Sequence, residues 1–327
     1  MIKFFKTNFI FLSIIIFASL LRFIGLDSVP AGFTQDEASQ AYSAYSISET
    51  GMDEWGNKYP LASFVSFLDY KAPLQTYLML PFIKVFGLGI WQARLPSAIA
   101  GVLAVVAIYF LTNLLFPKIN LLGTNLSTGH VSAFLLAISP WNLSFSRSAM
   151  EANLNPIFLF LGLIFYLRSF DKPNKLFASF LFFGLSAYSY HSAKVFLPLF
   201  LPLLSLYYFF KTKKPLVIAK SWLVLSIILA PLLVSTFSGS LRRGSELLLT
   251  NFSLKQLETI KDIQYLTPLP SILTRLFINK YTFSLKLFLD HYLGYFNPSF
   301  WFISGAGATS YSNLPEFGLI FPFLIAP

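Results

Sequence analysis

The chain has no cysteine and few charged residues. Of its 327 residues, 24 are lysine or arginine and only 14 are aspartate or glutamate, so that charged residues make up 12% of the sequence. Soluble domains carry about 25% charged residues, and this chain is not typical of them. The lack of cysteine excludes disulfides, thiolate metal sites and a cysteine nucleophile.

Common nucleotide-binding and zinc motifs are also missing. The sequence contains neither a P-loop nor a Gly-x-Gly-x-x-Gly turn. Its three histidines, His130, His191 and His291, lack the spacing of a His-Glu-x-x-His zinc site. We therefore predict no metal site, although a divalent metal is left open, and we favour a membrane lipid over a soluble nucleotide as the carrier of any transferred group.

Long apolar runs are abundant. The chain is 55% hydrophobic and 18% aromatic, with a mean hydropathy of +0.65. A helix needs about 20 apolar residues to span a bilayer. We predict an all-α polytopic membrane protein with a helical bundle. Its apolar segments lie at 8–26, 93–116, 131–146, 154–168, 176–190, 195–210, 217–237 and from Phe317 onward.

The lysines and arginines follow a topological pattern. If successive apolar runs cross the membrane in alternating directions, the basic residues fall on one side of it, at the N-terminus and in 117–130, 168–175 and 211–220. The positive-inside rule identifies that side as cytoplasmic. The net charge of +10 is thereby explained without nucleic acid as a partner. We predict an uncleaved first helix and a juxtamembrane helix from Leu74 to Ile90.

This topology leaves two large loops outside, residues 27–92 and 238–316. No soluble domain or internal repeat is visible, so we predict a single transmembrane domain over 1–327. The final apolar run stops at Pro327, which suggests a chain truncated at its C-terminus.

An adjacent acidic pair, Asp36 and Glu37, follows the first apolar run. We predict a helix from Glu37 to about Thr50, closed by Gly51. Asp36 would be a good N-cap and both acids favour the helix dipole, so a structural role is one reading. The other is catalysis, because the pair lies where a lipid headgroup and an aqueous acceptor meet.

Several basic residues of the outer face are candidates for binding phosphate. Lys71 is a candidate point charge for a lipid phosphate, or it reaches out to the interface as long side chains often do. Lys194 is a candidate for a second phosphate contact. Arg94 could snorkel to headgroups, hold a phosphate, or pair with Asp36 or Glu37. The pair Arg242-Arg243 is a weaker candidate.

The short outer turns contribute further candidates. Arg147 and Glu151 are four residues apart, the spacing of an ion pair on a helix. Alternatively Glu151 is a second catalytic carboxylate and Arg147 contacts phosphate. Tyr70, Tyr190 and His191 are candidates for contacts with the sugar or acceptor.

Taken in order, these elements resemble the GT-C superfamily of integral-membrane glycosyltransferases, nearest to the protein O-mannosyltransferases and the aminoarabinose transferases that modify lipid A. The resemblance covers nearly the whole chain. Its main pieces are 30–37, 50–56, 70–74, 86–97, Ser139-Pro140 with Arg147 and Glu151, 186–190, 292–298 and 305–318.

The resemblance implies a polyprenyl-phosphate sugar donor and a protein, lipid A or glycan acceptor at the extracytoplasmic face of a bacterial plasma membrane. It implies that Asp36 is the general base and that Lys71 binds the donor phosphate. The aminoarabinose enzymes carry a zinc-binding glutamate just before this lysine. Here the residue is Tyr70, which argues against a zinc site.

Two other functions are open to such a chain. A transporter or flippase of lipid-linked sugars usually places ionisable groups near the bilayer midplane, whereas these acids gather on the outer surface. A non-catalytic scaffold is the other alternative. The sequence favours the transferase.

Overall fold

The computed structural model describes residues 2–67, 69–116, 126–235, 252, 254–268 and 270–304. Part of the predicted cytoplasmic loop 117–130, the pair Arg242-Arg243, residues 305–318 and the apolar run from Phe317 fall outside these residues. The chain divides into two compact units, Met1–Ser235 and Thr236–Pro327, which are described separately. The prediction of a single domain stays a prediction.

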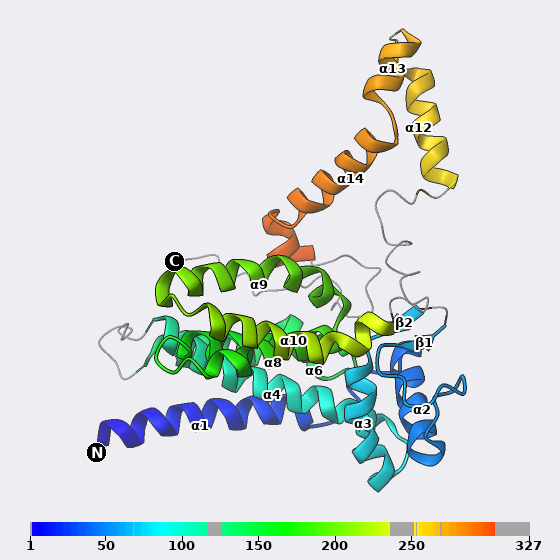
Figure 1. Ribbon diagram of the computed structural model, residues 1–327. Helices are drawn as coiled ribbons and strands as arrows, with labels where there is room; N and C mark the ends of the chain where they lie inside the picture. Colours follow the sequence, from blue (N-terminus) through cyan, green and yellow to red (C-terminus); the bar gives the residue numbers. More distant parts are fainter. Residues whose placement is uncertain are drawn as a thin grey trace. The chain divides into compact units, whose positions relative to one another are not determined.

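The first unit is a helical bundle with a small outer layer (Figure 1). Its first part consists of α1 (Ile2–Phe23), α2 (Gln35–Thr50), β1 (Phe64–Ser66), β2 (Asp69–Lys71), α3 (Pro73–Phe86) and α4 (Ile90–Leu115). Its second part consists of α5 (Thr128–Ile138), α6 (Pro140–Ser146), the 3-10 turn η2 (Glu151–Leu154), α7 (Asn155–Arg168), α8 (Lys175–Ser189), α9 (His191–Thr212) and α10 (Pro215–Ser235).

The bundle is built around two central helices. Helix α4 packs on α1, α5 and α7, while α8 packs on α7, α9 and α10. Helices α7 and α8 approach closely, since a Cβ on Gly162 would lie 2.7 Å from the ring of Phe183. Phe180 and Phe183 are fully buried in the resulting core. Figure 1 shows α2, α3 and the two strands gathered at the end of the bundle opposite the N-terminus.

Helices α2 and α3 form the outer layer, and small side chains of α2 allow the two helices to pack closely. Ala41 and Ala44 of α2 pack against Met79 and Ile83 of α3 and Ala93 of α4. The strands β1 and β2 pair antiparallel, with Ser66 opposite Asp69. Helix α3 has 14 residues, or about 21 Å at 1.5 Å per residue. That is shorter than the ~30 Å apolar core of a bilayer, as the juxtamembrane prediction requires.

Within the described residues, α4, α9 and α10 are long and apolar enough to cross a membrane. A fourth span results if α6 and the η2–α7 segment, bent by 114°, count as one. Phe9–Phe23, α5 and α8 are shorter apolar helices. All the predicted apolar runs that fall in the described residues are therefore helical, but several are shorter than a full span.

The prediction of one continuous helix was wrong for one segment. Residues 131–146 were expected as one helix, and the structure breaks them into α5 and α6 at Ser139. Pro140 disfavours a helical conformation in the residue before it, and Ser139 is indeed extended, with ψ 123°. Pro140 then opens α6 as its first residue, where its missing N–H is harmless.

The second unit contains α12 (Leu254–Leu266), α13 (Ser271–Phe277), α14 (Lys280–Gly294) and the π-helical turn η4 (Phe300–Ser304). Asn279 caps α14 by accepting hydrogen bonds from the backbone N–H groups of Tyr281 and Thr282. Within the described part of the predicted second outer loop, the chain is thus mainly helical.

Candidate active site

Lys71 lies at the centre of a charged cluster on the outer layer. Its Nζ is 2.9 Å from Oδ2 of Asp36 and 3.0 Å from Oδ2 of Asp69. Burial lowers the pKa of Lys71, but the hydrogen bonds and charges of the two aspartates outweigh it and raise that pKa. The ammonium is therefore charged at neutral pH. Asp36 and Lys71, predicted separately as base and phosphate ligand, meet in space.

The N-terminus of α2 differs from the prediction in a way that bears on Asp36. Asp36 was expected as the N-cap of a helix starting at Glu37, but α2 starts at Gln35 and Thr34 caps it. The Thr34 hydroxyl accepts the Glu37 N–H, while the Glu37 carboxylate accepts the Thr34 N–H at 2.9 Å. This capping box is a reciprocal pairing. Because Thr34 and Glu37 cap the helix, the carboxylate of Asp36 is not needed for capping and pairs with Lys71.

Glu151 lies against the residue that follows Lys71. Its Oε2 accepts a hydrogen bond of 2.7 Å from the backbone N–H of Ala72, and its side chain is buried. The break after α6 allows this contact, because η2 starts at Glu151 and redirects the chain. The structure thus brings Asp36, Lys71 and Glu151 together from three separate segments.

His191 fixes the same strand from another side. Its Nε2 lies 2.6 Å from the backbone oxygen of Tyr70, and its Nδ1 lies 3.3 Å from Nζ of Lys194. A carbonyl only accepts and an ammonium only donates, so the contacts fit a neutral ring with its proton on Nε2. Tyr70 takes part through its backbone, while Tyr190 is the N-cap of α9 and partly exposed.

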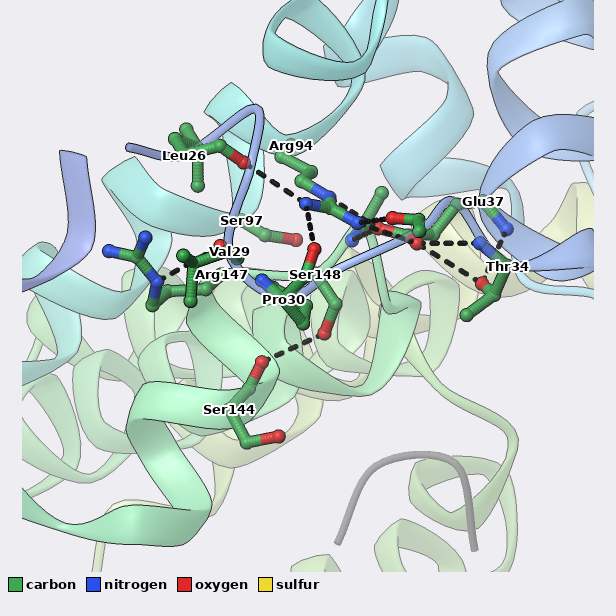
Figure 2. A network of polar contacts seen from close by, with 12 residues as sticks. Leu26, Val29, Pro30, Thr34, Glu37, Arg94, Ser97, Ser144, Arg147 and Ser148 are labelled. Atoms are coloured by element: carbon green, nitrogen blue, oxygen red, sulfur yellow. Dashed lines mark hydrogen bonds and ion pairs between the residues drawn. The ribbon is translucent and has the colours of Figure 1, made fainter. Parts of the chain in front are cut away.

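Glu37 and Arg94 form a closed network behind the cluster (Figure 2). Both side chains are fully buried. Arg94 donates to Glu37 through Nε at 2.9 Å and Nη2 at 3.2 Å. Its remaining donors reach the backbone oxygens of Leu26, Pro30 and Gly32. Glu37 Oε1 also accepts the N–H of Ala149.

This network engages Glu37 and Arg94, the side chains that the sequence interpretation made candidates for catalysis and for binding the donor phosphate. A guanidinium has five N–H donors, and the five contacts of Arg94 use them all. Of the alternatives for Arg94, the structure shows the pairing with Glu37. In this arrangement neither side chain reaches a ligand. Instead they hold the 26–34 segment, α2 and the loop before Glu151 in place.

Arg147 is directed toward the end of α1. It donates to the backbone oxygens of Leu21, Ile24, Gly25 and Val29 (Figure 2 labels Val29). Helix α6 ends at Ser146, so the four-residue spacing to Glu151 is not on a continuing helix. The two side chains serve different segments, and Arg147 joins the Leu21 carbonyl in the last turn of α1 to three carbonyls of the segment that follows the helix.

Asp69 is the member of the cluster that the sequence interpretation left unassigned. On a strand, residues two apart share a face, and Asp69 and Lys71 do so on β2. A strand of three residues is too short to give a periodic signal. The spacing Asp-x-Lys could have indicated the pair only if the strand had been expected.

An apolar cavity of about 340 Å³ adjoins the cluster. Pro73 and Leu74, just after Lys71, line it with Leu61, Tyr77, Leu185, Tyr188 and Ile228. The hydroxyls of Tyr77 and Tyr188 donate to the backbone oxygens of Pro60 and Ile228, so the cavity presents hydrocarbon. Charged groups thus stand beside a site suited to an apolar chain.

A metal site is not evident in the part of the chain that the structure describes. No group of three or more histidine, aspartate or glutamate side chains there has an arrangement that could hold a metal ion. The requirement for a divalent metal is left open, as it was from the sequence.

A profile of the family "Dolichyl-phosphate-mannose-protein mannosyltransferase" matches residues 70–238, which include Lys71, Glu151 and His191 but not Asp36. The comparison with curated protein sequences found no match.

Two solved structures are similar in fold. One is the archaeal oligosaccharyltransferase AglB from Archaeoglobus fulgidus in complex with an inhibitory peptide and a dolichol-phosphate, with a TM-score of 0.50 and 15% identity. The other is an oligosaccharyltransferase of the same organism in the apo form, with a TM-score of 0.47 and 16% identity. The matches cover 97% and 96% of this chain but 42% of each of those chains.

The profile spans more than half of the sequence, and the bundle with its juxtamembrane α3 has the GT-C fold. The chain is an integral membrane protein that belongs to the dolichyl-phosphate-mannose-protein mannosyltransferase family of the GT-C superfamily.

Proposed function

We propose that this chain transfers one sugar from a polyprenyl-phosphate donor to a protein, lipid or glycan acceptor at the extracytoplasmic face. The single observation that carries the proposal is the pairing of Asp36 with Lys71 beside an apolar cavity. Transfer from a lipid-phosphate donor requires a base for the acceptor, a cation for the phosphate and an apolar site for the lipid. The family and the AglB fold support the same class of reaction.

The donor would bind with its phosphate at Lys71 and the first part of its lipid in the cavity after Pro73. Lys71 is only 11% exposed, and its contact with phosphate at a poorly hydrated site counts for more than in bulk water. Lys194, beside His191, is a second candidate for the phosphate. Tyr190 and His191 remain candidates for contacts with the sugar or acceptor.

Asp36 would act as the general base. Its carboxylate would take the proton of an acceptor hydroxyl while the acceptor oxygen attacks the anomeric carbon. The bond from that carbon to the phosphate oxygen breaks, through a transition state like that of glycoside hydrolysis. Phosphate is a stable leaving anion, so no general acid is needed. The side chain of Asp36 is 43% exposed, as contact with an outside acceptor requires.

The other acids support this site rather than react in it. Glu151 fixes Ala72, next to Lys71, and Glu37 with Arg94 fixes the start of α2. We therefore propose Glu37, Arg94 and Arg147 as positioning residues and keep Asp36 as the base. Glu151, bound to the residue after Lys71, stays a candidate to orient the sugar as well.

Replacement of Asp36 by asparagine tests the base. General-base catalysis contributes about 10²–10⁴-fold, so Asp36→Asn should reduce transfer by at least about 100-fold while donor binding persists. The product formed from a defined polyprenyl-phosphate sugar and a membrane extract is measured by mass spectrometry. The exposed Asp27→Asn is the matched control.

Three outcomes would separate the functions. Loss of transfer with retained binding supports the transferase. Translocation of the lipid-linked sugar by the wild type, without any transfer product, would favour a transporter. Transfer by Asp36→Asn at the rate of the control would exclude Asp36 as the base.

A further inference from the structure

The positive charge of Lys71 is already more than neutralised before any donor binds. Its ammonium contacts two carboxylates, Asp36 at 2.9 Å and Asp69 at 3.0 Å. One positive and two negative charges leave the trio at a net charge of minus one. A site built only to attract a phosphate would not place two acids on its lysine. The contact of Asp69 with Lys71 is therefore not explained by phosphate binding alone.

Asp69 is held close to Lys71 by its own backbone. Its Oδ1 accepts the N–H of Tyr70 at 2.8 Å, while Oδ2 faces Lys71. It lies on β2, whose pairing with β1 sets Asp69 opposite Ser66. Asp36 comes from α2. A phosphate that reaches Lys71 can take the place of Asp36, while Asp69 remains beside the ammonium and faces the phosphate.

The proposed reaction changes the charge of the group at Lys71. The donor is a phosphodiester with one negative charge. When the acceptor oxygen bonds to the anomeric carbon and the bond to phosphate breaks, the acceptor proton passes to Asp36. The lipid leaves as a phosphomonoester, and because the second pKa of such groups is about 6, it carries close to two negative charges at pH 7.

We propose that Asp69 promotes release of the lipid-phosphate product, by setting a fixed negative charge against a phosphate that gains charge during transfer. This inference rests on the proposed function. Coulomb energy scales with the product of the charges, so Asp69 opposes the product about twice as strongly as it opposes the donor. Without Asp69, Lys71 would hold the product more tightly than the donor, and product inhibition would slow turnover.

The test compares donor and product affinity in wild type and in Asp69→Asn. Asparagine keeps the size of the side chain and an oxygen that can accept the Tyr70 N–H, but it removes the charge. We measure KM for a polyprenyl-phosphate sugar and Ki for the polyprenyl phosphate at low ionic strength. In Asp69→Asn the ratio of Ki to KM should fall by about threefold or more. Asp69→Glu keeps the charge and should keep the wild-type ratio.

A second measurement uses the unaltered protein. The methyl ester of polyprenyl phosphate has the same lipid but one negative charge. Wild type should bind the dianionic phosphate no more tightly than this ester, despite the extra charge. This comparison does not depend on the folding of a variant.

The inference is overturned if Asp69→Asn leaves the ratio of Ki to KM unchanged, or if wild type prefers the dianion to its ester by tenfold or more. A ratio that falls equally in Asp69→Glu would also overturn it, because the effect would then follow side-chain geometry. If wild type transfers no sugar from the donor at all, the proposed function fails first. The two failures are thus distinguishable.

Discussion

At the scale of single residues, the Glu37–Arg94 pair shows why an acidic pair in a sequence does not mean two catalytic acids. Asp36 and Glu37 are neighbours, yet the helix turns them to different surroundings. Asp36 meets Lys71 near water, and Glu37 is fully buried with Arg94. A buried carboxylate is tolerated only when paired and hydrogen-bonded, and here it receives contacts from Thr34, Arg94 and Ala149.

We predict that Glu37→Gln strongly destabilises the protein. The substitution leaves the guanidinium of Arg94 buried without a compensating charge, which typically costs about 3–5 kcal/mol. Thermal unfolding in detergent should show a clear decrease in Tm. Glu49→Gln, at an exposed acid of the same helix, should change stability by less than about 0.5 kcal/mol. Equal Tm values for the two variants would contradict the assignment of Glu37.

At the scale of elements, the site depends on where helices begin and break. The start of α2 at Gln35 directs Asp36 to Lys71, and the break after α6 brings Glu151 to Ala72. His191 starts α9 and reaches the oxygen of Tyr70. Asp36, Glu151 and His191 thus all lie at helix starts, where Glu151 and His191 meet backbone groups of residues 70–72 and Asp36 meets the side chain of Lys71.

The cap of α2 gives a prediction at this scale. Loss of a threonine N-cap costs about 1 kcal/mol, so Thr34→Ala should lower stability by about that amount. It should also reduce sugar transfer, because the first turn carries Asp36. Thr34→Ser keeps the hydroxyl and serves as the control in both the unfolding and the transfer assay. If Thr34→Ala transfers sugar as fast as Thr34→Ser, the cap does not position the base.

At the scale of the whole molecule, the charge pattern predicts which side each loop faces. The chain contains no cysteine, so single cysteines can report sidedness. Gln35→Cys, exposed beside Asp36, should react with a membrane-impermeant thiol reagent in intact cells. Asn174→Cys, exposed before α8, should react only after permeabilisation, since the loop 168–175 is predicted to be cytoplasmic.

The cysteine-free parent controls for background labelling in this experiment. Labelling of Gln35→Cys only after permeabilisation would place the proposed base in the cytosol and contradict the topology. The same result would end the proposal of an extracytoplasmic transferase, because the acceptor and the base would lie on different sides.

The sequence by itself determined the membrane class, most of the helical runs and the separate candidacy of Asp36 and Lys71 as site residues. These follow from local properties: apolar length, charge placement and residue order. Only the tertiary structure decided what each charged group contacts. Arg94 and Glu37 neutralise each other across 57 positions of sequence, and Asp69 joins Lys71 through a strand too short to detect. Packing decides which charged groups are buried. A buried charge that is left unpaired is costly, so the buried groups pair with each other and only the remaining ones can contact the substrate.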